Sequence, residues 1–395
     1  MLFAAKSFGV YVHIPYCIQR CTYCDFATYE QSKILPPTDY TQLLIREIEL
    51  KKSIFLRGKE SQTIDTLYFG GGTPSLFAIK DIVQIINALA SAGYPLSPDA
   101  ELTMELNPGT VNEEKLNEYL KLGFNRFSVG AQTFNQAHLK RVHREHSVND
   151  TIESLKLLGR YKLNYNFDLL FGMPHQTVAE LGHDLSQALE ILPPHISPYY
   201  LTVPEGHPLS RNRPVEDDQM IMFERIEDTL SKNGYSRYEI SNYARPGYES
   251  KHNYLYWSDQ NYWGLGLSSH SYLRSSPEAP WGNRFWNPNN IKIYQQEIGA
   301  LKPLELPTQL ADIYFETLKE NQSLTDFCHT SLRRAKGLIN TDLEAKFSAP
   351  SVTSAYKELN SLKERGLVQP TDLGFTLTSK GKLISNWVFE KLTFS

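Results

Sequence analysis

The sequence predicts an α/β protein built on a parallel sheet, with a further domain or appendage toward the C-terminus. Short apolar strands alternate with amphipathic helices from Gly9 to about Ile240, an order typical of strands joined by helical crossovers. The chain has 395 residues, which exceeds one ordinary core and favours two domains or one barrel with an appendage.

Six strands are predicted in this first part, which we expect to form one domain over residues 1–240. Between them, apolar residues recur at three- and four-residue spacing, as in Ile79, Ile82 and Ile86. Stripes of this kind are the core-facing sides of helices. The predicted strands are Gly9 to Ile14, Ile64 to Phe69, Glu101 to Leu106, Arg126 to Val129, Asn166 to Leu170 and His195 to Leu201.

Composition and charge indicate a globular cytoplasmic protein. Hydrophobic residues make up 41% and charged residues 21% of the chain. With 40 basic and 44 acidic residues the net charge is −4, which gives no general attraction for nucleic acid or anionic lipid. No apolar run approaches the ~20 residues of a membrane span, and Met1 to Pro15 lacks the order of a signal peptide. The sequence leaves two questions open: whether the protein contacts a membrane peripherally and whether it forms a homodimer.

Three of the four cysteines lie within eight residues, spaced Cys17-x3-Cys21-x2-Cys24. A short turning segment of this kind can direct three thiolates at one centre, and three soft ligands favour zinc or an iron–sulfur cluster. A structural zinc site normally has a fourth Cys or His, and His13 lies four residues before Cys17 in a strand-like run. We interpret the motif as a cluster site with one iron left open; zinc is the alternative.

This motif, with an aromatic residue before its last cysteine, resembles the cluster motif of radical S-adenosylmethionine (SAM) proteins. The resemblance implies a [4Fe–4S] cluster whose open iron is chelated by the amino and carboxylate groups of SAM. It implies an electron donor as a partner, because the reduced cluster of these proteins cleaves SAM to a 5′-deoxyadenosyl radical. It also implies that the six strands form a partial (β/α)6 barrel of TIM type, with ligands held at the strand ends.

The second predicted strand runs directly into the glycines Gly70, Gly71 and Gly72. Missing side chains allow backbone amides and carbonyls to approach a small polar ligand closely, although a triple glycine alone could be a permissive turn. After the cysteine motif, the glycines resemble the segment whose backbone binds the SAM amino group in radical SAM proteins. Gly71, Gly72 and Thr73 are therefore expected to line the methionine end of SAM.

Polar residues interrupt or follow apolar runs at later strand ends. A buried carboxylate must be paired or ligand-bound to offset its desolvation, although each residue alone could be a structural cap or ion-pair partner. As a set they resemble SAM contacts in the branch that contains oxygen-independent coproporphyrinogen III dehydrogenase and the HemW-type proteins. The dehydrogenase holds two SAM molecules, so the number of SAM molecules here stays open. The SAM contacts implied are Tyr11, Tyr23, Glu105, Gln132, Arg144 and Asp168.

Two departures separate the chain from the dehydrogenase. The dehydrogenase motif continues to a further Cys two places after the last ligand, where this sequence has Phe26. The dehydrogenase also carries a long extension before its first strand, whereas Tyr11 is reached here after ten residues. Both differences match the HemW-type haem chaperones, which are not credited with the dehydrogenase's decarboxylation.

An aromatic-rich segment at 241–302 is predicted to be irregular and to form a wall built from loops. Residues 241–290 hold four of the five tryptophans, and planar aromatic surface suits a flat macrocycle. The segment contains HNxxYW, the motif that marks HemW-type proteins. A neutral imidazole could ligate haem iron or orient a propionate; alternatively, the aromatics seal the barrel and the histidine is a hydrogen-bonded core residue. The haem contacts implied are His252, Asn253, Tyr256 and Trp257.

The proline-flanked stretch Pro303 to Pro307 is typical of a linker, so a C-terminal α+β domain is expected at 308–395. Its predicted order resembles a winged helix, the C-terminal module of the same branch. With 11 Lys and Arg against 10 Asp and Glu, its net charge of +1 is a poor footprint for nucleic acid, which favours a lid or docking module. Cys328 is expected to be a buried thiol. The predicted elements are a helix around Leu310 to Leu318, a helix at Ser351 to Arg365, a hairpin of Leu367–Gln369 and Phe375–Leu377, and a helix from Ser379.

Taken together, these patterns predict a cytoplasmic haem chaperone of HemW type. It would hold haem and a SAM-bound [4Fe–4S] cluster and hand haem to apo-acceptor proteins. The alternative is an enzyme, oxygen-independent coproporphyrinogen III dehydrogenase, and a third possibility is a winged-helix DNA binder with a structural metal. The sequence assigns no catalytic residue and does not decide whether the protein is an enzyme.

Overall fold

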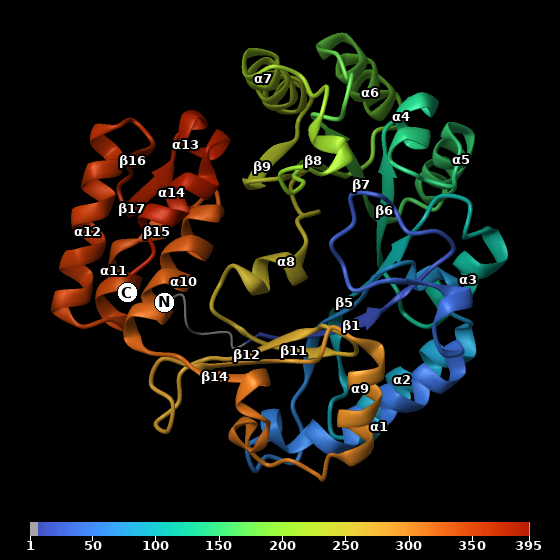
Figure 1. Ribbon diagram of the computed structural model, residues 1–395, viewed down its shortest axis with the longest axis vertical. Coiled ribbons are helices and arrows are strands. Elements are labelled where there is room, and N and C mark those ends of the chain that lie inside the picture. The colour runs from blue at the N-terminus through green and yellow to red at the C-terminus, as the bar shows by residue number, and fades with distance from the viewer. Residues whose placement is uncertain (1–6, 395) are drawn as a thin grey trace.

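Twelve strands form one mixed sheet at the centre of the protein, as seen in a computed structural model that describes residues 7–394 (Figure 1). The strand order is β14-β13-β12-β11-β1-β4-β5-β6-β7-β8-β10-β9, with two open edges. The parts of the sequence predictions that concern Met1 to Lys6 and Ser395 lie outside the described residues.

All six predicted strands are present, adjacent and parallel, and the α/β prediction is confirmed. Helical crossovers connect them, and in Figure 1 the helices α1 to α7 form an arc outside the strands. The six strands are β1 (Phe8–Ile14), β4 (Ile64–Gly71), β5 (Leu96–Leu106), β6 (Arg126–Gln132), β7 (Asn164–Phe171) and β8 (His195–Tyr200). The helices are α1 (Pro37–Leu56), α2 (Ile79–Ser91), α3 (Glu113–Lys121), α4 (Gln136–Arg141), α5 (Val148–Arg160), α6 (Val178–Ile191) and α7 (Glu216–Lys232).

Local sequence explains where these helices begin. The side chains of Asn112, Ser147 and Thr177 accept hydrogen bonds from backbone N–H groups in the first turns of α3, α5 and α6. These bonds satisfy donors that a helix start leaves unpaired. The helices bury their apolar stripes on the sheet, in a core that includes Leu44, Ile82 and Leu155.

The prediction that the aromatic-rich segment is irregular is wrong in part, because about half of residues 241–302 are strand or helix. β11 pairs in parallel with β1, so it adds a seventh parallel strand to the sheet. Tyr and Trp favour strands when they can pack on a pleated surface, and the buried Trp263 of β11 stacks on Phe55 of α1 with ring centroids 5.5 Å apart. The elements are β10 (Asn242–Ala244), α8 (Lys251–Tyr256), β11 (Asn261–Leu265), β12 (His270–Leu273), β13 (Asn283–Trp286) and α9 (Ile291–Ala300).

One buried carboxylate joins this segment to α1. Glu47 accepts hydrogen bonds from the Gly266 backbone N–H at 2.8 Å and from the Tyr294 hydroxyl at 2.7 Å. Lys51 and Asn287 also donate to it, at 2.8 and 2.7 Å. A buried charge is tolerated when it is paired and fully hydrogen-bonded, so this network explains how a polar cluster can lie inside the core.

The C-terminal residues pack around a second hydrophobic core that contains Leu324, Leu359 and the buried Cys328. The prediction of a helix around Leu310 to Leu318 is wrong: this stretch contains one single-turn 3-10 helix and the edge strand β14 (Phe315–Thr317). The other predicted elements are present, as α12 (Ala349–Glu364), β16 (Val368–Pro370), β17 (Gly374–Leu377), α13 (Ser379–Leu383) and α14 (Ser385–Lys391). The structure adds three elements that were not predicted: α10 (Glu320–Arg333), β15 (Leu338–Ile339) and α11 (Asn340–Lys346).

The end of α8 joins the sheet to this C-terminal unit. Trp257 lies under the guanidinium of Arg333, 4.7 Å from its ring centroid, and Asp259 forms a 2.8 Å ion pair with Lys346. In Figure 1, α8 lies on the inner side of the arc of strands, facing the C-terminal unit. Among the described residues, no helix has the length and apolar character needed to cross a membrane.

The remaining short elements complete the chain. They are β2 (Tyr16–Cys17), β3 (Tyr29–Glu30), β9 (Ser236–Glu239), and the 3-10 turns η1 (Gln31–Lys33), η2 (Pro74–Leu76), η3 (Pro208–Ser210), η4 (Pro307–Gln309) and η5 (Asp312–Tyr314).

Candidate functional site

A cavity of about 400 Å³ lies where the parallel strands end. In open α/β sheets this edge is the usual place for ligands. The cavity brings together every residue predicted for the cluster and for SAM except Tyr11. Those residues are Cys17, Cys21, Tyr23, Cys24, Gly71, Gly72, Thr73, Glu105, Gln132, Arg144 and Asp168.

The three cysteines lie on β2 and on the loop that follows it. Backbone hydrogen bonds hold the start of this segment to the glycines, from Thr73 N–H to the carbonyl of Tyr16 on β2 at 2.7 Å and from Gly72 N–H to the carbonyl of Ile14 on β1 at 2.8 Å. Burial raises the pKa of the Cys17 thiol to about 11, so binding of a metal by this residue would release a proton.

Among residues 7–394, no three His, Cys, Asp or Glu side chains are grouped as ligands of a single metal ion. In an iron–sulfur cluster each thiolate binds a different iron atom, so the cysteines of such a site do not have to meet at one point. His13 is turned away from a ligand role, since its Nε2 lies 3.0 Å from the Ala27 carbonyl oxygen and its Nδ1 lies 3.1 Å from the Tyr11 hydroxyl.

The glycine segment approaches the cysteine loop so closely that side chains do not fit. A Cβ on Gly72 would lie 2.5 Å from the Tyr16 carbonyl oxygen and 2.9 Å from the Cys17 sulfur. Gly71 has a φ of 117°, a conformation that other residues rarely adopt, and its Cβ would lie 2.7 Å from the His13 ring. The segment therefore forms a part of the cavity wall in which backbone, free of side chains at Gly71 and Gly72, faces the ligand space.

We expect Gly72→Ala to lower cluster occupancy, because the added methyl group pushes the Cys17 sulfur out of position. Iron and sulfide per chain after anaerobic reconstitution should fall to less than about half of wild type, since overpacking costs ~1–3 kcal/mol. Gly299→Ala is the matched control, because its Cβ would meet no atom within 4 Å. Equal iron content in the two variants would contradict the expectation.

Two carboxylates face the same cavity. Glu105 accepts hydrogen bonds from the Tyr68 hydroxyl at 2.8 Å and from the Gly71 backbone N–H at 3.0 Å. Asp168 accepts one from the Asn166 amide at 2.8 Å. Burial, with the Glu105 carboxylate as a smaller cause, raises the pKa of Asp168 to about 7. Two half-buried acceptors in one cavity suit a ligand that carries a positive charge and hydroxyl groups.

Arg144 connects the cavity to the cysteine loop. Its guanidinium donates to the Cys21 sulfur at 3.4 Å and also to the Gly130 carbonyl and the Asn107 side chain. Its Nε is buried without a hydrogen-bond partner among the described residues. Gln132, at a β-bulge of β6, has a φ of 70°, so the strand bends where it meets the cavity.

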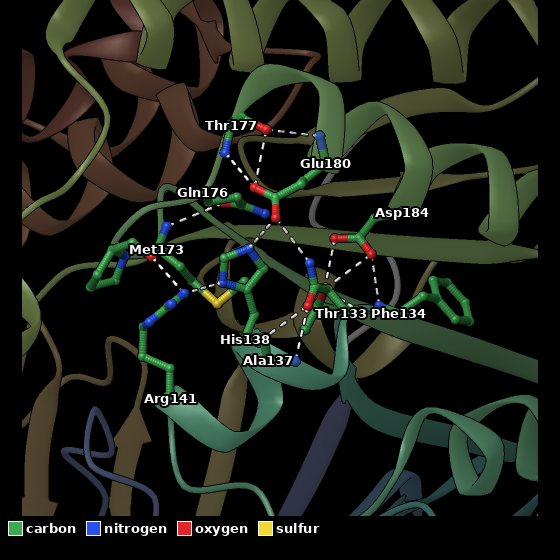
Figure 2. Close-up of polar contacts among 12 residues, drawn as sticks. Thr133, Phe134, Ala137, His138, Arg141, Met173, Gln176, Thr177, Glu180 and Asp184 are labelled. Carbon is green, nitrogen blue, oxygen red and sulfur yellow. Dashed lines mark hydrogen bonds and ion pairs between the residues drawn. The ribbon is translucent and has the colours of Figure 1, made fainter.

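A polar cluster between α4 and α6 supports the segment that carries Arg144 (Figure 2). The buried His138 accepts a hydrogen bond from Arg141 at 2.6 Å, and its Nε2 lies 3.4 Å from Glu180 of α6. Glu180 also completes a capping box with Thr177, the N-cap residue of α6. Since α4 ends at Arg141, the cluster fixes the helix end three residues before Arg144.

Removal of this cap should destabilise the protein modestly. We expect Thr177→Ala to lower the free energy of unfolding by about 1 kcal/mol, because a backbone N–H at the start of α6 loses its acceptor. Ser186→Ala is the control in the same helix, since the Ser186 hydroxyl donates to the Gly182 carbonyl and caps no helix start. Urea unfolding measures both variants, and equal midpoints would contradict the role assigned to Thr177.

Tyr11 does not line the cavity. Its ring lies 6.0 Å from the Tyr68 ring, centroid to centroid, and Tyr68 itself is a lining residue. Tyr11 therefore contacts the cavity wall from behind. Tyr23, by contrast, lines the cavity between Cys21 and Cys24.

The residues of the HNxxYW motif also lie outside the cavity lining. His252 is 2% exposed, with Nδ1 2.7 Å from the Thr66 hydroxyl and Nε2 2.9 Å from the Tyr256 hydroxyl. Burial lowers the pKa of His252 to about 3, so the imidazole is neutral. Its ring stacks on Tyr68 with centroids 5.0 Å apart. The geometry is that of a hydrogen-bonded core histidine, and axial ligation of a metal would require one of its two hydrogen bonds to break.

Several cavity-lining residues were missed by the sequence reasoning. Three of them lie at or just beyond strand ends, Asn107 after β5 and Tyr199 and Tyr200 at the end of β8, so a search of strand ends could have found them. Tyr68 and Ser128 lie within β4 and β6, and a tyrosine in a strand gives no signal because tyrosine is common there. The residues are Tyr68, Asn107, Ser128, Tyr199 and Tyr200.

Comparison with known proteins gives matches over nearly the whole chain. The model of the radical SAM superfamily matches residues 11–188. The protein of Escherichia coli (strain K12) named heme chaperone HemW is 38% identical over 66% of this chain and 69% of the relative. Its namesake in Lactococcus lactis (strain IL1403) is 32% identical over 98% of this chain and 97% of the relative. The Bacillus subtilis (strain 168) protein of that name is 30% identical over 96% of this chain and 98% of the relative.

A solved structure has a similar fold. Coproporphyrinogen III oxidase (HemN) from Escherichia coli, described as a radical SAM enzyme, aligns with a TM-score of 0.79. The alignment covers 98% of this chain and 90% of that chain at 21% identity. At this identity the likeness supports the fold alone.

Proposed function

The chain belongs to the HemW family of radical SAM proteins, and on that premise we propose that it binds haem and transfers it to apo-acceptor proteins. The observation that carries the proposal is the similarity to proteins named heme chaperone HemW over nearly the full length of both chains. The prediction that the chain belongs to this branch of radical SAM proteins is confirmed.

We further propose that Cys17, Cys21 and Cys24 hold a [4Fe–4S] cluster and that the cavity holds SAM on its open iron. The donor set fits, because three cysteines and a cradle without side chains at Gly71 and Gly72 face one cavity. When bound, a reduced cluster of this kind supplies the electron that cleaves SAM.

Within the cavity, the residues divide by chemistry. Glu105 would accept a hydrogen bond from the amino group of SAM, and Asp168 would accept hydrogen bonds from the ribose hydroxyls. The unpartnered Nε of Arg144 is a donor for the carboxylate. Thr73, Gln132 and Tyr23 complete the wall of the cavity. Tyr11 packs behind Tyr68 and would hold that lining residue in position.

The finer description of the fold is also a proposal. We assign residues 1–240 to a partial (β/α)6 barrel of TIM type, 241–302 to the aromatic-rich segment and 308–395 to a winged-helix-like domain. The six adjacent parallel strands and the three-stranded sheet β15-β17-β16 among α10 to α14 support these assignments. The proposed location is the cytoplasm, with an electron donor and haem-accepting proteins as partners; a homodimer and peripheral membrane contact are part of the same proposal.

One experiment tests the function. Protein reconstituted anaerobically with iron and sulfide should bind haem in a spectrophotometric titration and pass it to an apo-haemoprotein, with recovery of that protein's activity. The protein without a cluster, mixed with the same haem and acceptor, is the control for free diffusion of haem. If the reconstituted protein binds no haem, the proposal is wrong.

The alternative function is that of a coproporphyrinogen III dehydrogenase. The sequence argues against it at Phe26, where that enzyme has a further cysteine. The reconstituted protein, supplied with coproporphyrinogen III, SAM and a reductant, should form no protoporphyrinogen IX. Product formation at an enzymatic rate would favour the dehydrogenase.

A further inference from the structure

The open rim of the cavity is apolar and aromatic. Ile18 and Phe26 of the cysteine loop line the cavity and are 53% and 63% exposed. Tyr199 and Tyr200, at the end of β8, line it from another side and are 40% and 39% exposed. Large side chains that both line a cavity and face solvent mark a surface where a partner or ligand would bury them.

The rim also carries a histidine with a free ring. His143 is exposed and lines the cavity, and no residue in 7–394 hydrogen-bonds its imidazole. Its φ of 56° is uncommon for a residue with a side chain. By contrast, both ring nitrogens of His252 are hydrogen-bonded in the core. Of these two histidines, His143 is the one that can bind a metal without losing a bond.

A positive charge lies beside the same rim. The Arg213 guanidinium lies 4.6 Å from the centroid of the Tyr200 ring and is anchored by donating to the Gly172 carbonyl at 2.9 Å. An anchored cation next to an aromatic surface suits a ligand that is flat, apolar and edged with carboxylates.

We propose that haem lies across this rim, its ring plane against Phe26 and Tyr199, and that His143 ligates its iron. This placement rests on the proposed haem-binding function and names its site. Haem bound there covers the mouth of the cavity, because residues of the rim and of the cavity floor line one continuous space. A ligand in the cavity below would then leave only after the haem moves.

Haem titration of single variants tests the site. Phe26→Ala and Tyr199→Ala should each raise the haem dissociation constant by about tenfold, the effect of removing one large aromatic contact. Phe26 is largely exposed and Tyr199 is 40% exposed, and urea unfolding of both variants checks that the fold is retained. Tyr248→Ala is the matched control, since Tyr248 is 37% exposed and lies outside the cavity lining.

Absorption and magnetic circular dichroism spectra test the iron ligand. His143→Ala should lose the spectral signature of histidine ligation, whereas His183→Ala, which removes an exposed histidine of α6, and His252→Ala should keep it. The second readout is SAM exchange from the reconstituted protein. At a haem concentration that fills wild type but lies below the dissociation constant of Tyr199→Ala, haem should slow exchange by about tenfold in wild type and much less in the variant.

The outcomes separate this placement from the function itself. If wild type binds no haem, the proposed function fails. If wild type binds haem and the rim variants bind it equally well, the function stands and the placement is wrong. Loss of the histidine signature in His252→Ala, with His143→Ala unchanged, would place the haem at the HNxxYW motif instead.

Discussion

Cys24→Ser is expected to abolish cluster assembly. A [4Fe–4S] cluster held by three thiolates has no spare protein ligand, so the loss of one sulfur leaves two irons without a protein donor. Wild type should bind about four iron and four sulfide per chain after anaerobic reconstitution. The variant should bind little of either, lose the sulfur-to-iron charge-transfer absorption, and bind no SAM in equilibrium dialysis. Cys17→Ser and Cys21→Ser should behave in the same way.

The fourth cysteine provides the control. Cys328 is buried in the C-terminal core, where burial raises the pKa of its thiol to about 12, so it is a poor metal ligand. Cys328→Ala should retain full iron and sulfide. Elemental analysis also separates the alternatives: zinc in place of iron in the protein as isolated without oxygen would contradict the cluster, as would a normal iron content in Cys24→Ser.

The site could be predicted from sequence because its residues obey simple rules. Parallel strands direct their carboxyl ends to one edge of a sheet. For this reason Glu105 and Asp168, separated by 63 residues in the chain, could be expected in one cavity. The cysteine spacing and the triple glycine are local patterns and needed no knowledge of the fold. All of these residues except Gly70 line the cavity.

The aromatic-rich segment could not be predicted in the same way, because tertiary pairing determines its structure. β11 becomes a strand by adding to β1, a partner about 250 residues earlier in the chain. The burial of His252 depends on Thr66 of β4 and on Tyr256. The motif HNxxYW identifies the family, but its letters do not indicate whether the histidine faces a ligand or the core.

The rim residues show a further limit. Tyr199 and Tyr200 end a predicted strand, and their exposure depends on where β8 stops relative to the cysteine loop. Phe26 was singled out because it replaces a cysteine of the dehydrogenase, and the structure adds that it is exposed at the cavity mouth. Phe26 therefore distinguishes the chain from the dehydrogenase in sequence, and it also lies at the cavity mouth, where a change of residue would affect ligand binding.

Asp168→Asn is expected to weaken SAM binding while it stabilises the ligand-free protein. In the folded chain, burial raises the pKa of Asp168 to about 7, above the ordinary value of 3.8 for an aspartate. The folded protein therefore binds a proton more tightly than the unfolded chain does. Stability from this group is fully present below pH 4 and is lost as pH rises toward about 7. At pH 8 Asp168 is ionised, and holding its charge in the folded protein costs free energy. The neutral amide of Asn removes this desolvation cost, so the free energy of unfolding should rise by about 1–3 kcal/mol.

SAM affinity should change in the opposite direction, because a carboxylate is a stronger acceptor than an amide and lies in a cavity that suits a cation. The SAM dissociation constant at pH 8 should rise about tenfold in Asp168→Asn. Wild-type affinity should increase between pH 6 and pH 8 as Asp168 ionises, and the variant should lack this dependence. Urea unfolding and anaerobic calorimetry at the two pH values measure both effects. Asp228→Asn, an exposed carboxylate of α7, is the control that should change neither.

The two effects together distinguish a binding residue from a structural one. If Asp168 were an ordinary structural acceptor for the Asn166 amide, its replacement would lower stability and leave the pH dependence of SAM binding unchanged. A gain in stability with a loss of affinity has a different cause: the folded protein holds a carboxylate in a place that only a bound ligand compensates. Lower stability of Asp168→Asn at pH 8 would therefore contradict the assignment of Asp168 to the SAM site.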